Sequence, residues 1–161
     1  MSFVRLWLFI GAALLASSVS SCDSVPTGPG TGSGNLLRAT INGTTETFTL
    51  VEQRYDAFAT YSFVSGVSAS TKTLTISFTS DIRTGSFPRT LASDDVNIIY
   101  IERVGGQDVV YDCVTHNSAR AMTLTRNSGG IIDGTFTGTP TNRNDASSTV
   151  TITSGEFSVT L

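Results

Sequence analysis

The chain has 161 residues, which is enough for one domain with a sizeable hydrophobic core. Its 10 Lys and Arg residues against 13 Asp and Glu residues give a formal net charge of −3, so nucleic acid is not an expected partner. The 25 Thr and 21 Ser residues favour an all-β domain, and a hydrophobic fraction of 39% that recurs at every second position argues against disorder.

The first element along the chain is a signal for export. A single cation, Arg5, precedes an apolar run over residues 6–16, which is too short to span a bilayer core of about 30 Å. Small residues then lead to a cysteine in the segment Val19-Ser20-Ser21-Cys22. We therefore expect a signal helix over residues 1–21 that is cleaved between Ser21 and Cys22. The alternative is an ordinary signal peptide followed by a chance cysteine.

The segment Val19-Ser20-Ser21-Cys22 resembles the lipobox of bacterial lipoproteins, which consists of an aliphatic residue, two small residues and a cysteine. The resemblance implies that Cys22 carries a diacylated thioether and, after cleavage, an acylated amino group, with chains of the palmitate type. It also implies a lipoprotein held to a membrane of the bacterial cell envelope. A lipidated Cys22 could form no disulfide, so Cys113 is expected to be unpaired.

The folded domain is expected to follow a tether. Residues 22–34 are rich in Gly, Ser and Pro, a composition typical of a flexible linker. The first structural signal after them is the pair Asn42-Gly43 between two alternating stretches. It predicts a hairpin with a two-residue turn, in which Leu37 lies opposite Phe48.

The next segments alternate with different regularity. Residues 55–70 alternate loosely, with Gly66 as a candidate bulge. Residues 72–79 form the cleanest strand, because apolar residues occupy every second position. Pro88 has no backbone N–H, so the short strand after it should lie at a sheet edge.

A second hairpin is predicted around Gly105-Gly106. With these two glycines as the turn, Tyr100 lies opposite Tyr111 and Cys113 lies opposite Ile98. Cys113 then belongs to an apolar row, which predicts a buried and inert thiol.

Three features are expected in the C-terminal part. A three-residue loop over residues 128–130 would place Met122 opposite Phe136. Residues 140–148 are expected to form a polar loop. In residues 149–161 the apolar positions change from even to odd numbers, which predicts a bulge near residues 154–156.

These patterns predict one all-β domain over residues 35–161. The expected architecture is an antiparallel β-sandwich or a partly closed barrel of about eight to ten strands, after a cleaved N-terminal signal helix.

Short motifs in this domain resemble a known family. They are Ile132-Asp-Gly-Thr-Phe-Thr-Gly138, Val150-Thr-Ile-Thr-Ser-Gly-Glu-Phe-Ser-Val159 and, near the start, Ala39-Thr-Ile-Asn-Gly43. Such turn glycines and inward aromatics are similar to those of the small β-rich lipoproteins of unknown function found in Bacteroidota. The resemblance covers most of residues 37–161 and implies a β fold and an outer-membrane location. It implies no catalytic residue.

No catalytic or metal-binding constellation is evident in the sequence. His116 is the only histidine, whereas a zinc site needs several His or Cys ligands. Cys113 and His116 are three positions apart, so on a strand they point to opposite faces and form no nucleophilic pair. We therefore expect His116 at the surface, and neither a metal nor a cofactor.

Carboxylates are the remaining candidates for chemistry. They cluster at Asp94-Asp95 and over residues 142–145, and neither cluster has the spacing of a helix–loop–helix calcium site. Asp108 and Asp112 share a strand face, but the rise of a strand separates them by about 13 Å, too far for one site. Solvated turns are the default interpretation of these groups.

The leading hypothesis is a lipid-anchored accessory protein of the cell envelope, at the outer rather than the inner membrane. It would bind a ligand, such as an envelope glycan, or a partner protein, without catalysing a reaction. The alternatives are a small envelope hydrolase that cleaves glycans with carboxylates from separate loops, and a purely structural envelope component. Two carboxylates about 5–9 Å apart in a pocket would favour the hydrolase. An exposed aromatic platform or a long apolar groove would favour binding.

Overall fold

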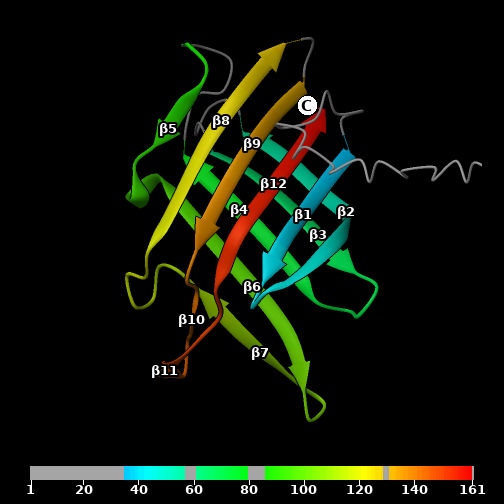
Figure 1. Cartoon of the computed structure of the whole chain (residues 1–161), viewed down its shortest axis with the longest axis vertical. Helices are drawn as coiled ribbons and strands as arrows, with labels where there is room; N and C mark the ends of the chain where they lie inside the picture. The colour runs from blue at the N-terminus through cyan, green and yellow to red at the C-terminus, as the bar shows by residue number, and fades with distance from the viewer. Residues whose placement is uncertain (1–34, 57–60, 80–85, 129–130, 161) are drawn as a thin grey trace, which may run out of the picture.

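The computed structural model describes residues 35–56, 61–79, 86–128 and 131–160. The protein is all-β, and its strands form one curled antiparallel sheet of 12 strands, a half-barrel (Figure 1). One turn of 3-10 helix, η1 (Ser93–Asp95), precedes the sixth strand. The strands are β1 (Asn35–Ile41), β2 (Thr44–Asp56), β3 (Tyr61–Ser68), β4 (Thr73–Thr79), β5 (Arg89–Leu91), β6 (Val96–Val104), β7 (Gln107–Asp112), β8 (Arg120–Ser128), β9 (Ile131–Gly138), β10 (Thr141–Asn142), β11 (Asp145–Thr149) and β12 (Ile152–Thr160).

This architecture confirms the predicted fold class, an antiparallel and partly closed β structure. The strands are more numerous than the eight to ten expected, because β10 and β11 occupy part of the segment 140–148 that we predicted to be a loop. The loop prediction was wrong for β11, which is an exposed strand at the end of the sheet with polar residues on both faces. Such a strand shows no alternation of apolar and polar residues. The short strand after Pro88, β5, lies at the other edge, as predicted.

The sheet curls because one strand belongs to two layers. Neighbouring strands follow the order β11-β10-β7-β6-β4-β3-β2-β1-β12-β9-β8-β5. In Figure 1, β8, β9, β12 and β1 form a front layer that crosses over β2, β3, β4 and β6 behind it. The first part of β2, Thr44–Thr47, pairs with β1, and the part from Phe48 onward pairs with β3. Strand β2 is therefore the corner of the half-barrel.

The corner strand contains a bulge. The register between β2 and β3 shifts between Leu50, which pairs with Gly66, and Glu52, which pairs with Ser65, so Val51 is the extra residue. We predicted the bulge at Gly66 itself, and the structure corrects this to the partner strand. A Cβ atom on Gly66 would lie 2.8 Å from the Cβ of Phe48, so glycine is needed there for the close approach of two strands.

Both predicted two-residue hairpins are confirmed. Ile41 lies opposite Thr44, which is the register that places Leu37 and Phe48 on one face, and both of these residues are buried. Tyr100 lies opposite Tyr111, with ring centroids 6.0 Å apart. The four turn residues have the positive φ that a type I′ turn needs: Asn42 (48°), Gly43 (82°), Gly105 (60°) and Gly106 (84°).

The register of β8 and β9 is also as predicted, but its cause is different. Met122 lies opposite Phe136. Ser128 already pairs with Ile131, so the connection is not the expected three-residue loop. The predicted pairing of Met122 with Phe136 results instead from a bulge at Thr125, because the register between β8 and β9 shifts between Leu124 and Arg126.

The C-terminal strand is central to the front layer. Strand β12 lies between β1 and β9, and its register shifts between Ile152 and Ser154 against β1 and between Ile152 and Gly155 against β9. Two residues of β12, Thr153 and Ser154, thus stand where a regular strand would have one. This confirms the predicted bulge, which begins at Thr153. Leu161 lies outside the described residues.

The hydrophobic core fills the space between the two layers. Two aromatic rings occupy space that glycines leave free, since a Cβ on Gly134 would lie 2.5 Å from the ring of Phe157 and one on Gly155 would lie 2.3 Å from that of Phe136. The described part of the chain has one hydrophobic core, to which both layers contribute. Its buried hydrophobic residues are Leu37, Ala39, Ile41, Phe48, Val64, Leu74, Ile76, Phe78, Leu91, Val96, Ile98, Tyr100, Tyr111, Cys113, Met122, Leu124, Ile132, Phe136, Val150, Ile152, Phe157 and Val159.

Arg120, the first residue of β8, ties the front layer to the back layer. Its Nε donates to the backbone oxygens of Ser93 and Val96, each at 2.7 Å. Its Nη1 donates to the backbone oxygens of Cys113, at 2.7 Å, and Ser118, at 3.0 Å. Only 5% of the side chain is exposed. Strands β6 and β8 are not neighbours in the sheet. The hydrogen bonds of Arg120 therefore connect the two layers on the side of the half-barrel opposite β2.

Candidate functional site

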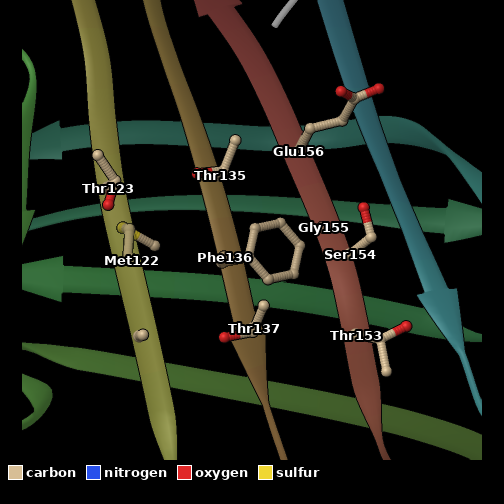
Figure 2. Close-up of a pocket in the computed structure, with 10 residues that line it drawn as sticks. Met122, Thr123, Thr135, Phe136, Thr137, Thr153, Ser154, Gly155 and Glu156 are labelled. Atoms are coloured by element: carbon tan, nitrogen blue, oxygen red, sulfur yellow. The ribbon is translucent and has the colours of Figure 1, made fainter. Parts of the chain in front are cut away.

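A hollow of about 350 Å³ lies on the outer face of the front layer, over β8, β9 and β12. Along each of these strands, alternate side chains enter the core, and those between them face outward. In Figure 2 the labelled outward side chains are threonines and a serine, and the one carboxylate, Glu156, lies at the edge of the group. We call this feature the threonine hollow. It is lined by Ala121, Met122, Thr123, Thr135, Phe136, Thr137, Thr153, Ser154, Gly155 and Glu156.

The bulge in β12 increases the density of hydroxyl groups in this hollow. Consecutive residues of a regular strand point to opposite faces. At the bulge, Thr153 and Ser154 are both exposed, and both line the hollow. The residues beneath it, Met122 and Phe136, belong to the core and are almost fully buried. The hollow thus has a rigid apolar floor and a hydroxyl-rich rim.

Two further hollows adjoin the threonine hollow. One, of about 390 Å³, shares Ala121, Thr137 and Thr153 with it. The other, of about 270 Å³, shares Ser154 and Glu156. We call the three together the outer groove, which runs across β8, β9, β12, β1 and β2. The first adjoining hollow is also lined by Ala119, Arg120, Gly138, Thr139, Thr151 and Ile152, and the second by Arg38, Thr40 and Thr45.

The charges of the outer groove compensate one another. Arg38 and Glu156 lie opposite each other on β1 and β12 and form an ion pair. Arg120 borders the groove, but its guanidinium is buried against backbone oxygens. The hydroxyls of Thr40 and Thr45 are 2.9 Å apart and form a hydrogen bond across β1 and β2. The groove therefore presents mainly hydroxyl groups, with no net field that would select a strongly charged ligand.

A second polar group of side chains, which we call the tyrosine cluster, lies at one end of the core. Glu102 accepts hydrogen bonds from the hydroxyls of Tyr111, at 3.2 Å, and Tyr100, at 3.3 Å. Glu46 of β2 forms an ion pair with Lys72. Burial first, and then the nearby carboxylates of Glu102 and Glu46, raise the pKa of Tyr100.

The carboxylates of the tyrosine cluster are occupied within the protein. Both oxygens of Glu102 accept hydrogen bonds from tyrosine hydroxyls, and Glu46 is paired with Lys72 and accepts a hydrogen bond from Ser70 at 3.4 Å. A general acid or a nucleophile needs an oxygen that faces a substrate. The contacts of Glu102 instead hold β6 against β7, and those of Glu46 hold β2 against the turn between β3 and β4, so the cluster is a structural feature.

The structure agrees with the sequence prediction for Cys113 and His116. Cys113 is fully buried, and its backbone N–H donates to Ile98 at 3.2 Å, as the predicted register requires. Burial raises the pKa of the Cys113 thiol to about 11, so the reactive thiolate is scarce at neutral pH. His116 is exposed in the turn after β7. The two residues form no catalytic pair.

The carboxylates that the sequence offered as candidates lie in separate places. Asp94 and Asp95 are exposed in η1. Asp108 is exposed and pairs with Arg103 at 3.6 Å. Among the described residues, no group of three or more His, Cys, Asp or Glu side chains could hold a metal ion.

Asp112 is the exception, because it is buried. It accepts hydrogen bonds from the backbone N–H groups of Val114, at 3.0 Å, and Thr115, at 2.7 Å, and forms an ion pair with Arg143. Burial alone would raise the pKa of Asp112, but the hydrogen bonds from Thr115 and Arg143 outweigh it and lower the pKa. Asp112 thus caps a turn, and Arg143 of the predicted 142–145 cluster is its partner.

The asparagine of the first hairpin also has a structural role. The Oδ1 of Asn42 accepts a hydrogen bond from the backbone N–H of Thr151 at 2.8 Å, and the Asn42 N–H donates to the Thr151 oxygen at 2.8 Å. These two bonds fasten the turn to the start of β12.

The proposed anchor lies in the part of the chain that is not described. The signal segment 1–21, the cleavage position at Ser21, the lipidation position Cys22 and the tether 22–34 are all outside the described residues. Within the described part, no helix has the length and apolarity to cross a membrane.

Comparisons with known proteins add no assignment. No protein-family model matches the chain, and no curated protein or solved structure is similar enough to count as a match.

Proposed function

We propose that the protein is a lipid-anchored module of the bacterial cell envelope that binds a ligand or partner in the outer groove without catalysing a reaction. The lipobox supports the anchor. The observation that carries the binding function is the junction of three hollows at the bulge of β12, where Thr153 and Ser154 each line two of them. Bulges occur often next to functional sites, where they redirect side chains.

The chemistry of the groove favours binding over hydrolysis. Glycoside hydrolases of the usual kind need two carboxyl groups about 5–9 Å apart. The carboxylate that lines the outer groove is Glu156, which is paired with Arg38. Hydroxyl groups on strands, by contrast, can donate and accept hydrogen bonds without any change of protonation.

The anchor is tested by replacing the lipidated residue. A Cys22→Ala variant should leave the detergent phase in a two-phase partition of whole cells, because no thioether lipid can form. A Cys113→Ala variant is the matched control and should partition like the unchanged protein. Unchanged detergent-phase partitioning of Cys22→Ala would refute the lipid anchor.

Binding in the groove is tested by blocking it. Ala121 is exposed and lines two of the hollows, so Ala121→Arg should fill the groove without disturbing the core. The lipid-free mature chain, residues 23–161, should sediment with washed cell envelopes, and Ala121→Arg should not. Ala146→Arg, on the exposed edge strand β11, is the matched control and should sediment normally. Equal sedimentation of all three proteins would contradict a binding function of the groove.

A further inference from the structure

We propose that the ligand of the outer groove is a neutral glycan strand that lies across β8, β9, β12 and β1. This inference rests on the binding function proposed above and specifies its ligand class. Three observations support it: the groove is continuous, its side chains are mainly hydroxyls, and the exposed large apolar side chains of the described residues lie outside it.

The shape of the groove suits an extended ligand. The threonine hollow is open to solvent and joined at both ends, through Thr153 on one side and Ser154 on the other. A small metabolite would be expected in an enclosed pocket that buries most of its surface. A polymer needs the opposite, a surface depression that it can enter and leave at both ends. The bulge at Thr153 and Ser154 makes the three hollows continuous.

The side chains of the groove suit a ligand made of hydroxyl groups. Each Thr or Ser hydroxyl offers one donor and two acceptor positions, which matches the equally ambivalent hydroxyls of a sugar. The threonines add methyl groups that can contact the C–H faces of a sugar ring. Thr123, Thr135 and Thr137 present this combination on β8 and β9, and Thr153 continues it on β12.

The charge of the groove argues against an acidic glycan. Arg38 is the exposed cation in the groove, and its guanidinium already pairs with Glu156. Binding of a carboxylated sugar at Arg38 would have to break this ion pair and leave Glu156 beside a second negative charge. A neutral strand can accept from Arg38 and donate to Glu156 while the pair stays intact.

The distribution of apolar surface argues against a protein partner. Binding energy between proteins concentrates in large apolar or aromatic anchors at the centre of an interface. In the described ranges, the large hydrophobic residues that are well exposed are Val51, Val104 and Val114, and none of them lines the groove. Phe136 lies beneath the groove but is only 2% exposed. A protein would find no anchor there.

The test uses defined sugars and the lipid-free mature chain. Neutral hexasaccharides of β-1,4-glucose, α-1,4-glucose and β-1,4-N-acetylglucosamine are titrated by NMR or calorimetry, beside a hexasaccharide of uronic acid. At least one neutral hexasaccharide should bind, weakly because no aromatic ring is available for stacking. The double variant Thr153→Ala/Ser154→Ala should bind it about tenfold more weakly, as expected for the loss of hydroxyl contacts worth about 1.4 kcal/mol.

Matched threonine changes outside the groove serve as the control. Thr49→Ala/Thr149→Ala removes two exposed strand hydroxyls that do not line the groove and should bind like the unchanged protein. The inference is overturned if no neutral hexasaccharide binds, if the uronic acid hexasaccharide binds more tightly than all neutral ones, or if the Thr153→Ala/Ser154→Ala variant binds normally.

A second measurement separates this inference from the function on which it rests. Washed envelopes are digested with protease before the sedimentation experiment. A glycan ligand survives digestion, so sedimentation should persist and Ala121→Arg should still abolish it. Sedimentation that disappears after digestion would overturn the glycan assignment and leave the binding function of the groove standing.

Discussion

The front and back layers of the half-barrel are joined in different ways on their two sides. On one side, β2 passes from the front layer to the back layer as continuous backbone, with Val51 as a bulge after the corner. On the other side, β6 and β8 are not sheet neighbours, and Arg120 donates hydrogen bonds to four backbone oxygens. One join is a continuous strand, and the other depends on hydrogen bonds, of which the side chain of Arg120 makes four.

The sheet curls without closing into a barrel because its end strands, β5 and β11, do not pair with each other in the described part of the chain. Strands β6 and β8 do not pair with each other, because β6 already pairs with β4 and β7 and β8 already pairs with β9 and β5. The guanidinium of Arg120 satisfies only the few carbonyl groups near the start of each strand. Both end strands are short, and among the described residues neither has a neighbour on its outer side. The two joins should therefore respond differently to single substitutions.

The largest effect is expected at Arg120. Arg120→Met should lower the free energy of unfolding by at least about 3 kcal/mol, because it removes the side-chain donor from four carbonyl groups, two of them on the buried residues Val96 and Cys113. Arg120→Lys should recover part of this loss, since one ammonium group cannot reach all four oxygens. Urea denaturation measures both variants.

The matched control for Arg120 is an exposed arginine. Arg103 pairs with Asp108 at the surface, and both side chains are 66% exposed, so Arg103→Met should leave the urea midpoint nearly unchanged. Similar midpoints for Arg103→Met and Arg120→Met would show that Arg120 does not join the layers.

The next effect is expected at the β2 corner. Gly66→Ala would place a Cβ 2.8 Å from that of Phe48 and 3.0 Å from the backbone oxygen of Thr49, so the strands would have to separate. The cost should be about 1–3 kcal/mol, the usual range for overpacking. A thermal melt measures it, and an unchanged melting temperature would show that β2 and β3 have room to adjust. The loss of stability should be smaller than in Arg120→Met, because the neighbouring residue pairs between β2 and β3 can each shift slightly to accommodate the added methyl group.

The sequence predicted one of these joins far better than the other. The hairpin that leads into the corner depends on a local signal, the turn residues Asn42-Gly43, so its register could be derived. The bulge in β12 was also predictable, because apolar positions change parity between Ile152 and Phe157. The bulge predicted at Gly66 was assigned to the wrong strand, because Leu50 and Val51 are both apolar and hide the change of phase in β2.

The join at Arg120 and the outer groove could not be predicted in the same way. Arg120 occupies an ordinary polar position in an alternating stretch, and its four acceptors lie elsewhere in the chain. The groove combines positions 38–45, 119–123, 135–139 and 151–156, which only the folded sheet brings together. Threonines on a strand suggest a solvated face. The predicted bulge was the one local signal that pointed to this site.

A third prediction concerns the turn that Arg120 holds. Asp112 caps the turn after β7, one residue before Cys113, whose carbonyl accepts from Arg120. Asp112→Asn should cost about 1–2 kcal/mol at pH 7, because it loses charge-assisted hydrogen bonds. The share of Arg143 in this loss should be small, since 47% of its side chain is exposed.

The pH dependence gives Asp112 a specific signature. The pKa of Asp112 is lowered in the folded protein, so its contribution to stability is present above the unfolded pKa of about 4 and is lost as the pH falls through the folded value. The difference between the unchanged protein and Asp112→Asn should therefore shrink at pH 3. Urea denaturation at pH 7 and pH 3 measures it. A difference that does not depend on pH would assign the loss to packing alone.

The smallest effect is expected at the bulge of the corner strand. Val51 is 61% exposed, so Val51→Thr keeps the β-branched shape and removes little buried surface. It should change the free energy of unfolding by less than about 0.5 kcal/mol. Val64→Thr is the matched control on β3, where the side chain is 2% exposed, and its buried hydroxyl should cost about 1–3 kcal/mol. If Val51→Thr proved as costly as Val64→Thr, the identity of the extra residue would matter, and the bulge would be held by its side chain. If it is neutral, the corner depends on the backbone of β2 alone, in contrast to the join made by the side chain of Arg120.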